Sequence, residues 1–238
     1  MTDIPGNGGP LRLLDTGLAS AGWNIAMTAA LAELHRAGRA PDTLRLHRYP
    51  RSVLLGRHQP LSAAEPLPGV EVARRVTGGG AVYMAPGVVA WELVTARRGP
   101  LDALAATVCG AVAAALGGLG YPARFQPPGD VLLAGGKVSG SAGWHEGNTV
   151  VLQGTVLVAA DLAELARALR LDDPGVAALP APAPDPDTVA RAVAEKIAAA
   201  LGRPLVPGTP GAEERARADR LLAREIGTAA FIAGEEPA

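Results

Sequence analysis

The sequence is short of cysteine and of net charge, and each shortage excludes a class of protein. Its 238 residues include one cysteine, Cys109, so an intrachain disulfide and a thiolate metal cluster are both impossible. Basic and acidic residues number 22 and 23 and are interspersed, which leaves no broad charged surface for nucleic acid or an anionic membrane. We therefore expect a reducing compartment and no nucleic-acid partner.

Long apolar runs and a leader are also missing. We find no run of the ~18 apolar residues expected of a membrane span. The first ten residues, MTDIPGNGGP, lack the basic start and the apolar core of a signal peptide. These features predict a cytoplasmic protein without a membrane partner. Because 48% of the residues are apolar, the chain can bury a substantial core, either of one large domain or of one domain with a small appendage.

Two glycine-rich segments carry the clearest chemical signal. The first, RRVTGGGAVY at 74–83, joins two arginines and a threonine to three glycines, and the second, GDVLLAGGKVSGS at 129–141, places a lysine beside two glycines. Glycine lets backbone amides approach a ligand, and arginine and lysine supply charge-assisted hydrogen bonds to phosphate or carboxylate. Each segment alone fits a tight turn with solvated cations about equally well. Together they indicate a site for an anionic ligand.

The apolar pattern predicts strands in hairpins and helices in pairs. Strand-like runs occupy 11–15, 43–49, 52–57, 70–76, 81–83, 88–95, 131–134, 138–144 and 149–158, and helical runs occupy 21–37, 101–116, 161–171, 188–201 and 211–230. Residues 43–49 alternate as a half-buried strand does, and Pro50 suggests a hairpin to 52–57. The Pro/Ala stretch between the third and fourth helices should be extended and mobile.

This order of elements favours an α+β fold over a doubly wound parallel sheet. Neither glycine segment has the strand, G-x-G-x-x-G, helix order of a dinucleotide fold or the pattern of a P-loop. Cys109 lies among small apolar residues of the 101–116 helix without a cationic neighbour, which predicts a buried structural thiol.

The ordered motifs RRVTGGGAVY, GDVLLAGGKVSGSA and VVLQGTVLV resemble the lipoate-protein ligase A family, whose relatives include octanoyltransferases and biotin-protein ligases. The resemblance extends upstream to LRLLDTG, GWNIAMTAALAELH and LRLHRYPRSVLLGRHQ, so it covers most of residues 11–165. It implies a mixed, largely antiparallel sheet flanked by helices, in a biotin/lipoate-protein-ligase-like catalytic domain. We place this domain at 11–205, after a flexible N-terminus at 1–10 and before a C-terminal helix and tail at 206–238, which is no full accessory domain.

The implied activity is the activation of lipoate or octanoate by ATP, with Mg²⁺, to an acyl adenylate. The acyl group then passes to a lysine of a lipoyl-domain or H-protein-like carrier. The first step needs cations at the phosphate but no base, since the acid is already ionised near neutral pH. Either a separate accessory subunit replaces the missing C-terminal domain or this branch works without one.

The resemblance assigns the catalytic role to Lys137, in contact with the substrate carboxylate and the α-phosphate. The residues expected to bind substrate and nucleotide come from three motifs: Arg74, Arg75, Thr77, Gly78, Gly79, Gly80, Ala81, Val82 and Tyr83 from the first, Asp130, Ser139 and Gly140 from the second, and Gly154 and Thr155 from the third. Arg57 is a further candidate phosphate contact, with a solvated arginine as the alternative. His58 and His145 are candidate bases by residue type alone, and no resident metal site is expected.

Three positions depart from the family pattern and keep the function open. Met84 and Ala85 stand where the family usually has His-Asp or His-Gly, and Gln153 stands where a histidine is common. An octanoyltransferase needs a catalytic cysteine, which this chain lacks at either position the family uses. A non-catalytic paralogue that binds a lipoyl or acyl-adenylate ligand is a third possibility. The missing thiol favours the ATP-dependent ligase.

Overall fold

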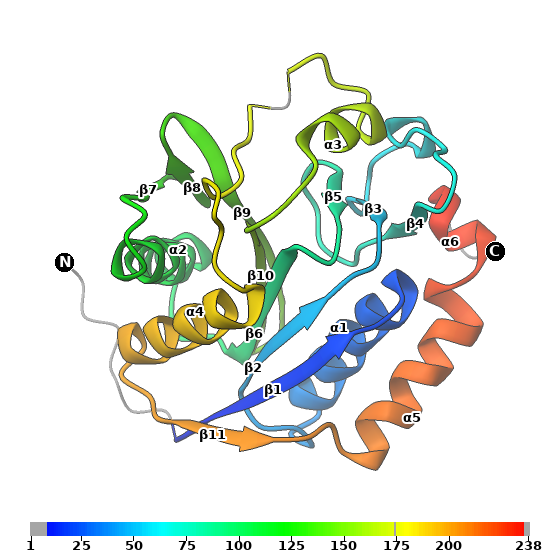
Figure 1. Ribbon diagram of the computed structural model, residues 1–238. Helices are drawn as coiled ribbons and strands as arrows, with labels where there is room; N and C mark the ends of the chain where they lie inside the picture. The colour runs from blue at the N-terminus through cyan, green and yellow to red at the C-terminus, as the bar shows by residue number, and fades with distance from the viewer. Residues whose placement is uncertain (1–8, 174, 236–238) are drawn as a thin grey trace.

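Eight strands form the larger of two sheets in the computed structural model, which describes residues 9–173 and 175–235 (Figure 1). The strand order is β11-β1-β2-β6-β10-β9-β8-β7. The bounds are Leu11–Leu18 for β1, Thr43–Arg48 for β2, Val88–Ala96 for β6, Arg124–Gln126 for β7, Asp130–Leu133 for β8, Gly136–Glu146 for β9, Thr149–Leu157 for β10 and Leu205–Gly208 for β11. The pairs β1–β2 and β1–β11 are parallel and the others are antiparallel, which confirms the expected mixed sheet.

A smaller sheet of three strands lies beside it, in the order β4-β3-β5. Its strands are β3 (Ser52–Leu55), β4 (Glu71–Arg74) and β5 (Val82–Met84), and a short 3₁₀ turn, η1 (Leu61–Ala63), lies between β3 and β4. The expected hairpin between 43–49 and 52–57 is wrong, because β2 belongs to the larger sheet and β3 to the smaller one. The chain around Pro50 therefore crosses from one sheet to the other.

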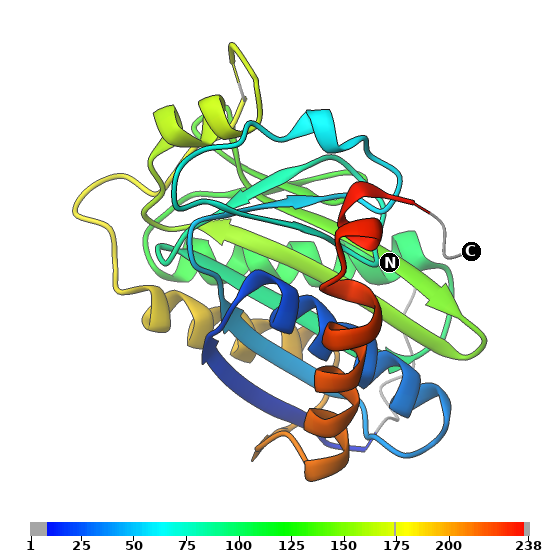
Figure 2. The same ribbon diagram turned by 90° about the vertical axis from the view of Figure 1, so that its right-hand side faces the viewer.

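Helices cover both faces of the larger sheet (Figure 1). On one face lie α2 (Leu101–Gly118) and α4 (Pro186–Ala200), packed on strand residues such as Leu44, Trp91 and Leu152. On the other face lies α1 (Ala21–Arg36), and α5 (Ala212–Leu221) runs along it on the outside, as Figure 2 shows. Because α1 is enclosed between the sheet and α5, most of its residues are buried.

The strand predicted to be half-buried is buried on both faces. On β2, Leu44 and Leu46 pack against α2 and α4, whereas Thr43, Arg45 and His47 are buried on the side of α1 and the smaller sheet. The alternation is therefore real, but its polar side chains point into the protein rather than into water.

Helix α2 corrects the expectation that no segment is long and apolar enough to span a membrane. By length and composition it could span a membrane, since its 18 residues have a mean hydropathy of 1.6. Its buried residues, which include Val108, Val112 and Leu116, belong to the core between α2, α4 and the sheet. The apolar run thus has a packing role in this fold.

The C-terminal segment joins both sheets. Strand β11 pairs with β1 at the sheet edge, and after α5 the chain continues through a π-helical turn, η2 (Leu222–Ile226), to α6 (Ala229–Ala233). Helix α6 lies against β4, where Arg74 donates hydrogen bonds to the carbonyls of Phe231 and Ile232. Most of the expected flexible N-terminus lies outside the described residues.

The remaining helix, α3 (Leu162–Ala168), begins after Asp161, whose carboxylate accepts a hydrogen bond from the Glu164 amide as predicted for an N-cap. The described part of the following Pro/Ala stretch is held to the sheet at residues 175–179. There the Lys137 amide donates to the Gly175 carbonyl, and the Leu179 amide donates to the Leu157 carbonyl.

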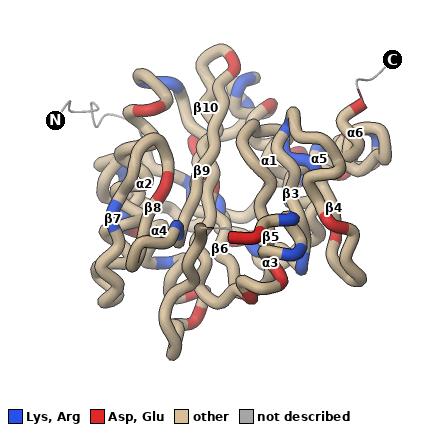
Figure 3. The backbone as a smooth tube through the Cα atoms, turned by 90° about the horizontal axis from the view of Figure 1, so that it is seen from above, with Lys and Arg blue, Asp and Glu red and all other residues tan. Residues whose placement is uncertain are grey.

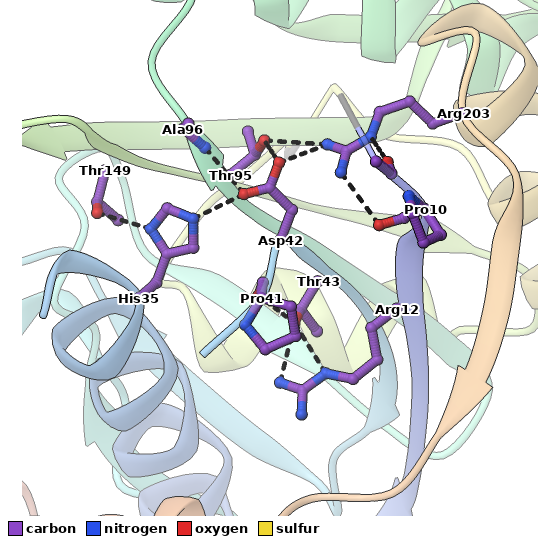
Figure 4. Close-up of polar contacts among 11 residues, drawn as sticks. Pro10, Arg12, His35, Pro41, Asp42, Thr43, Thr95, Ala96, Thr149 and Arg203 are labelled. Carbon is purple, nitrogen blue, oxygen red and sulfur yellow. Dashed lines mark hydrogen bonds and ion pairs between the residues drawn. The ribbon is translucent and has the colours of Figure 1, made fainter. Parts of the chain in front are cut away.

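A polar cluster around Asp42 closes one end of the larger sheet (Figure 4). One carboxylate oxygen lies 2.7 Å from Nε2 of His35, and the other accepts hydrogen bonds from Thr95 at 2.7 Å and from Arg203 at 2.5 Å. The second ring nitrogen of His35 contacts the Thr149 hydroxyl at 2.8 Å. The cluster ties together the end of α1, the start of β2 and β10, the end of β6 and the chain after α4.

Charged residues of both signs are distributed over the whole fold (Figure 3). Exposed ion pairs such as Arg36–Glu146 and Arg39–Glu213 join neighbouring elements. This agrees with the near-zero net charge of the sequence.

Candidate functional site

A pocket of about 250 Å³ lies between the two sheets. Its apolar lining includes Leu54, Ala81, Val82, Met84, Ala90, Leu157, Leu165 and Leu169. Its polar lining includes His47, Tyr49, Arg75, Tyr83, Lys137, Ser141, Gln153 and Thr155. The second glycine segment, strands β3 and β5 of the smaller sheet, and the middle of the larger sheet therefore meet at one cavity.

The floor of the pocket follows from the strand register. Ala90 of β6 pairs with His47 of β2 on one side and with Thr155 of β10 on the other, so these three side chains form one row across the sheet. On β9, Gly140 directly precedes Ser141, the partner of Gly154, so in this antiparallel pair it lies beside Thr155 and continues the row. Because Ala90 and Gly140 are small, the row is a shallow trough between polar residues.

Lys137 lies at one end of this trough. A β-bulge in β9 sets Leu132 opposite Lys137 but Val131 opposite Ser139, and bulges re-aim neighbouring side chains. A Cβ atom on Gly140 would lie 2.4 Å from Cε and 2.7 Å from Nζ of Lys137, so the lysine chain lies directly over this glycine. Its Nζ is 2.7 Å from an oxygen of Asp130, and 39% of the lysine side chain is exposed. The amine is fixed by one carboxylate and still accessible from the pocket.

The triple-glycine loop forms another wall and is held by Arg75. The buried guanidinium donates hydrogen bonds to the carbonyls of Leu54, Gly78 and Gly80 and to the Thr77 hydroxyl. Burial lowers the pKa of Arg75 to about 10, which leaves it cationic at neutral pH. Arg75 therefore shapes the loop with its own hydrogen bonds.

Three glycines in this region are required, one by its backbone conformation and two by close contacts. Gly79 has a φ of +89°, and its carbonyl oxygen lies 1.9 Å from the position that a Cβ on Gly56 would take. Either residue with a side chain would strain the loop or push the two backbones apart. On the floor, a Cβ on Gly154 would lie 2.3 Å from the ring of Trp91.

Most, but not all, of the residues expected to bind substrate line the pocket. The structure brings together Lys137, Arg75, Gly79, Gly80, Ala81, Val82, Tyr83, Gly140, Gly154 and Thr155. Asp130 is connected to the pocket by its ion pair with Lys137. Thr77 and Gly78 are connected to it by the hydrogen bonds that they accept from Arg75. Ser139 is fully buried behind the wall.

Arg74 is not brought to the pocket. Its fully buried guanidinium donates to the carbonyls of Gly56, Gln59, Phe231 and Ile232, and thus joins the loop after β3 to helix α6. Consecutive residues of a strand point to opposite sides, which explains why Arg74 and Arg75 differ. The structure places Arg74 as an anchor behind the loop.

The other candidates lie elsewhere. The guanidinium of Arg57 stacks on the Phe231 ring, 4.9 Å from its centroid. His145 is exposed and lies beside Arg97, and neither it nor His58 belongs to the lining. Neither of the two candidate bases, His58 and His145, therefore lies in the pocket.

The pocket contains residues that sequence reasoning did not assign to it, namely His47, Tyr49 and Ser141. His47 lies on the same face of β2 as Arg45, which forms a buried ion pair with Glu92 at 2.8 Å. Burial, with a smaller effect of the Arg45 charge, holds the pKa of His47 well below 6.5, and burial raises the pKa of Tyr49. Both rings are neutral. The alternation along β2 places His47 and Arg45 on one face of the strand, but it does not tell whether that face is covered.

Gln153, which stands at the position where a histidine is common in the family, connects floor and wall. Its amide nitrogen donates to the Thr77 hydroxyl at 3.0 Å, the same hydroxyl that accepts from Arg75. The larger sheet therefore supports the glycine loop through one side chain.

Cys109 lies behind the pocket wall rather than in it. It is fully buried in α2, and its Sγ is 3.3 Å from the hydroxyl of Ser141. Burial raises its pKa, so the thiolate is disfavoured. The predicted buried thiol is confirmed.

Within residues 9–173 and 175–235 there is no group of three or more His, Cys, Asp or Glu side chains that could hold a metal ion. The carboxylate of Asp130 lies next to Lys137, but it is already paired with the lysine amine. A metal that takes part here must therefore bring most of its ligands with it.

Comparisons with known proteins identify the family of the chain. A family model described as the lipoyl protein ligase A/B catalytic domain matches residues 20–192. Octanoyltransferase LipM of Kyrpidia tusciae is 28% identical over 90% of this chain and 96% of its own, and a candidate lipoate-protein ligase A of Aeropyrum pernix is 30% identical over 65% and 60%.

Among solved structures, protein Ta0514, a candidate lipoate protein ligase from T. acidophilum with bound lipoic acid, superposes with a TM-score of 0.83 at 25% identity. The match covers 95% of this chain and 99% of that one. The fold, the motifs and the extent of these matches lead to one conclusion: the chain belongs to the lipoyl protein ligase A/B catalytic-domain family.

Proposed function

We propose that this protein is an ATP-dependent ligase that activates lipoate or octanoate as an acyl adenylate and transfers the acyl group to a lysine of a carrier domain. One observation carries the proposal. The amine of Lys137 lies at the end of a largely apolar pocket, and within the described residues the sequence's single thiol is not part of the lining.

The pocket suits a medium-length acyl chain. Leu54, Val82 and Met84 cover it from the smaller sheet, while Ala90 leaves room on the floor. Each buried methylene contributes roughly 0.8 kcal/mol, so the chain would supply most of the affinity. The bound lipoic acid of the T. acidophilum protein supports this choice of substrate.

The proposed first step joins the acid to the nucleotide. A carboxylate oxygen attacks the α-phosphorus of ATP, the bond to the β-phosphate oxygen breaks, and pyrophosphate leaves with its Mg²⁺. Lys137 offsets the negative charge shared by the carboxylate and the α-phosphate, and the Gly79 and Gly80 backbone approaches the phosphate. Mg²⁺ enters as part of the co-substrate, bound mainly by phosphate oxygens.

In the second step the carrier lysine attacks the acyl carbonyl, the bond to AMP breaks, and the amine loses a proton. The remaining residues would act by position: Arg75, Thr77 and Gly78 fix the loop, Asp130 orients Lys137, and Gly154 and Thr155 form the floor. Ala81, Val82 and Tyr83 would contact the acyl chain. Arg74 would act indirectly, through the loop after β3.

The named relatives supply a second candidate, an octanoyltransferase. That reaction would transfer octanoate from a carrier thioester to a cysteine and then to a lysine, which requires an accessible thiolate. Cys109 is the sequence's one cysteine, and it is buried behind Ser141 with a raised pKa. These facts favour the ligase.

The proposed partner is a lipoyl-domain or H-protein-like carrier, in the cytoplasm. A separate accessory subunit is a further proposed partner.

The test is incubation with ATP, Mg²⁺ and lipoate or octanoate, followed by measurement of pyrophosphate and of mass gain on an apo carrier domain. We expect acid-dependent pyrophosphate release and a mass gain equal to the acyl group. Pyrophosphate release without mass gain would indicate a missing accessory subunit.

The matched control is Cys109→Ser, assayed in parallel with octanoyl carrier thioester as the donor. The ligase proposal requires that this variant keep its ATP-dependent activity. Acyl transfer from the thioester that is lost in Cys109→Ser, with no pyrophosphate release by the wild type, would establish the transferase instead. Ligand binding without either reaction would favour a non-catalytic paralogue.

A further inference from the structure

Arg74 is a buried cation whose charge is balanced by carbonyl groups rather than by a carboxylate. Arg74 is fully buried, and among the described residues its guanidinium donates hydrogen bonds to backbone carbonyls alone. Arg45, which is equally buried, is instead paired with Glu92. Because a buried charge is costly unless its partners stay in place, the segments that carry these carbonyls have to be held against Arg74.

The carbonyls belong to two segments that are far apart in the sequence. Nη1 bonds those of Gly56, Arg57 and Gln59, in the loop after β3, which we call the 56–59 loop. Nε and Nη2 bond those of Phe231 and Ile232, in the last turn of α6. The last carbonyls of a helix have no partner inside it and carry its negative end, so a cation stabilises them. One guanidinium thus fastens the C-terminal helix to the 56–59 loop.

Phe231 makes a second contact with the same loop. The guanidinium of Arg57 lies over its ring, 4.9 Å from the centroid, and the face of an aromatic ring attracts a cation. Of the five residues of α6, all of which the structure describes, Phe231 alone is buried. The attachment of α6 to the smaller sheet therefore depends mainly on this side chain and on Arg74.

The 56–59 loop in turn contacts the triple-glycine loop of the pocket. The Arg57 amide donates a hydrogen bond to the Thr77 carbonyl at 2.9 Å. A Cβ on Gly56 would lie 1.9 Å from the Gly79 carbonyl oxygen, so the two backbones touch with no side chain between them. Gly79 and Gly80 line the pocket. A displacement of the 56–59 loop would therefore move one wall of the pocket.

We propose that Phe231 is a positioning residue of the pocket: by docking α6 on Arg57 and Arg74, it keeps the triple-glycine loop in the shape that binds the ligand. Phe231 does not belong to the pocket lining and acts through the 56–59 loop. The inference rests on the proposed function for its ligand, lipoate, and for its reaction, the release of pyrophosphate. It gives the C-terminal segment a role in the site.

A purely structural role of Phe231 predicts a different result. In that case its loss would weaken the whole fold, as would the loss of Leu221, a buried residue of α5 in the same core cluster beside α1. A positioning role predicts a local effect at the 56–59 loop and the triple-glycine loop. Phe231→Ala and Leu221→Ala are therefore a matched pair.

The first measurement is amide hydrogen exchange in the ligand-free protein, with the amides of β6 as the reference for global stability. In Phe231→Ala the Arg57 amide, which reports the bond to Thr77, should exchange at least about tenfold faster relative to β6. In Leu221→Ala this ratio should stay that of wild type. Phe231→Tyr keeps an aromatic ring under Arg57 and should restore slow exchange.

The second measurement is the Kd of lipoate by calorimetry without ATP, followed by the kcat of pyrophosphate release. Phe231→Ala should raise Kd and lower kcat by about tenfold each, because a loosened wall no longer holds the ligand in place. Leu221→Ala and Phe231→Tyr should both stay close to wild type.

A second pair of variants leaves the aromatic side chain intact. Gly234, at the end of α6, has a φ of +85°, and a Cβ there would lie 3.0 Å from Nη2 of Arg74. Gly120, after the end of α2, has a φ of +91°, and a Cβ there would meet no described atom within 4 Å. Alanine strains both backbones, but only Gly234→Ala pushes on Arg74. Faster exchange of the Arg57 amide and weaker binding should therefore occur in Gly234→Ala and be absent in Gly120→Ala.

Equal changes in the two members of each pair would overturn the inference, as would faster exchange without a change in Kd. If Phe231→Ala does not fold, the pair Gly234→Ala and Gly120→Ala decides. Wild type that binds lipoate but releases no pyrophosphate would refute the ligase, and the Kd ratios would still decide the role of Phe231. Wild type that binds no lipoate would refute both.

Discussion

The two polar clusters of the larger sheet differ in what they leave unbonded. At one end, both oxygens of Asp42 and both ring nitrogens of His35 have partners, as Figure 4 shows. In the pocket, Nδ1 of His47 has no partner within the described residues, and the Lys137 amine has one carboxylate and is partly exposed. We infer from this comparison that the Asp42 cluster holds the fold, and we propose that the polar groups of the pocket bind a ligand.

The difference also appears in the glycines. Near Lys137, Gly140 makes room for the amine, and near Arg75, Gly56 makes room for Gly79. The Asp42 cluster instead gathers ordinary side chains from five segments. Removing a group from the pocket should therefore change activity, and removing one from the Asp42 cluster should change stability.

The largest expected effect is the loss of activity in Lys137→Ala. Removal of a cation that stabilises developing charge should slow pyrophosphate release by about a thousandfold, with unchanged unfolding in urea. The sequence has one other lysine, Lys196, which is exposed on α4, so Lys196→Ala is the matched control. Full activity in Lys137→Ala would refute its catalytic role.

Asp42→Ala should act in the opposite way. It leaves His35 and Arg203 without their carboxylate, and the free energy of unfolding should fall by about 3 kcal/mol. Urea unfolding gives this value, and ligand affinity well below the unfolding midpoint should be unchanged. Glu146→Ala, which breaks an exposed pair with Arg36, should cost less than about 1 kcal/mol. A loss of affinity in Asp42→Ala without a loss of stability would contradict the assignment of stability to the Asp42 cluster and of activity to the pocket.

Gly140→Ala tests the contact between backbone and amine. The new methyl group would meet the far end of the Lys137 side chain, which can move at little cost. We expect an unfolding midpoint close to that of wild type and a rate reduced by about tenfold, since small displacements of a catalytic group are costly. Gly110→Ala, at a helical glycine with open space around it, is the control for adding a methyl group.

The smallest effect is a dependence of stability on pH. Burial alone would raise the pKa of Asp42, but hydrogen bonds from His35, Thr95 and Arg203, with the charge of Arg203, hold it well below 3.8. A lowered folded-state pKa adds stability above the pKa of the unfolded chain, and this is lost as the pH falls through the acid range. Between about pH 5 and pH 2, wild type should therefore lose stability more steeply than Asp42→Asn. If the free energy of unfolding falls with pH equally in wild type and Asp42→Asn, carboxylates other than Asp42 cause the acid sensitivity.

The sequence predicted the two glycine-rich segments as parts of a site, but it did not predict which strands and helices surround them. The glycines and Lys137 signal a site because few other roles require them together. Local pattern could not tell that β2 and β3 enter different sheets, because strand pairing depends on distant segments. Alternation places Arg74 and Arg75 on opposite sides of the chain, but it could not tell which of them faces α6 and which faces the loop.

His47 was missed for a related reason. A histidine between apolar residues on an alternating strand has the same pattern whether its face is wet or covered. The cover here comes from α1 and the smaller sheet, which lie far away in the sequence. Only the assembled fold decides between these possibilities.

The hydrogen bonds of Arg75 have a consequence for dynamics. Because the guanidinium bonds the carbonyls of Leu54, Gly78 and Gly80, the loop is held in one shape without a ligand. Hydrogen exchange in the ligand-free protein should find the amides around Arg75 slow, and ligand should slow them little further. If the loop is such a rigid wall of the proposed site, the rate of association should be set by entry of the acid and not by a folding step of the loop.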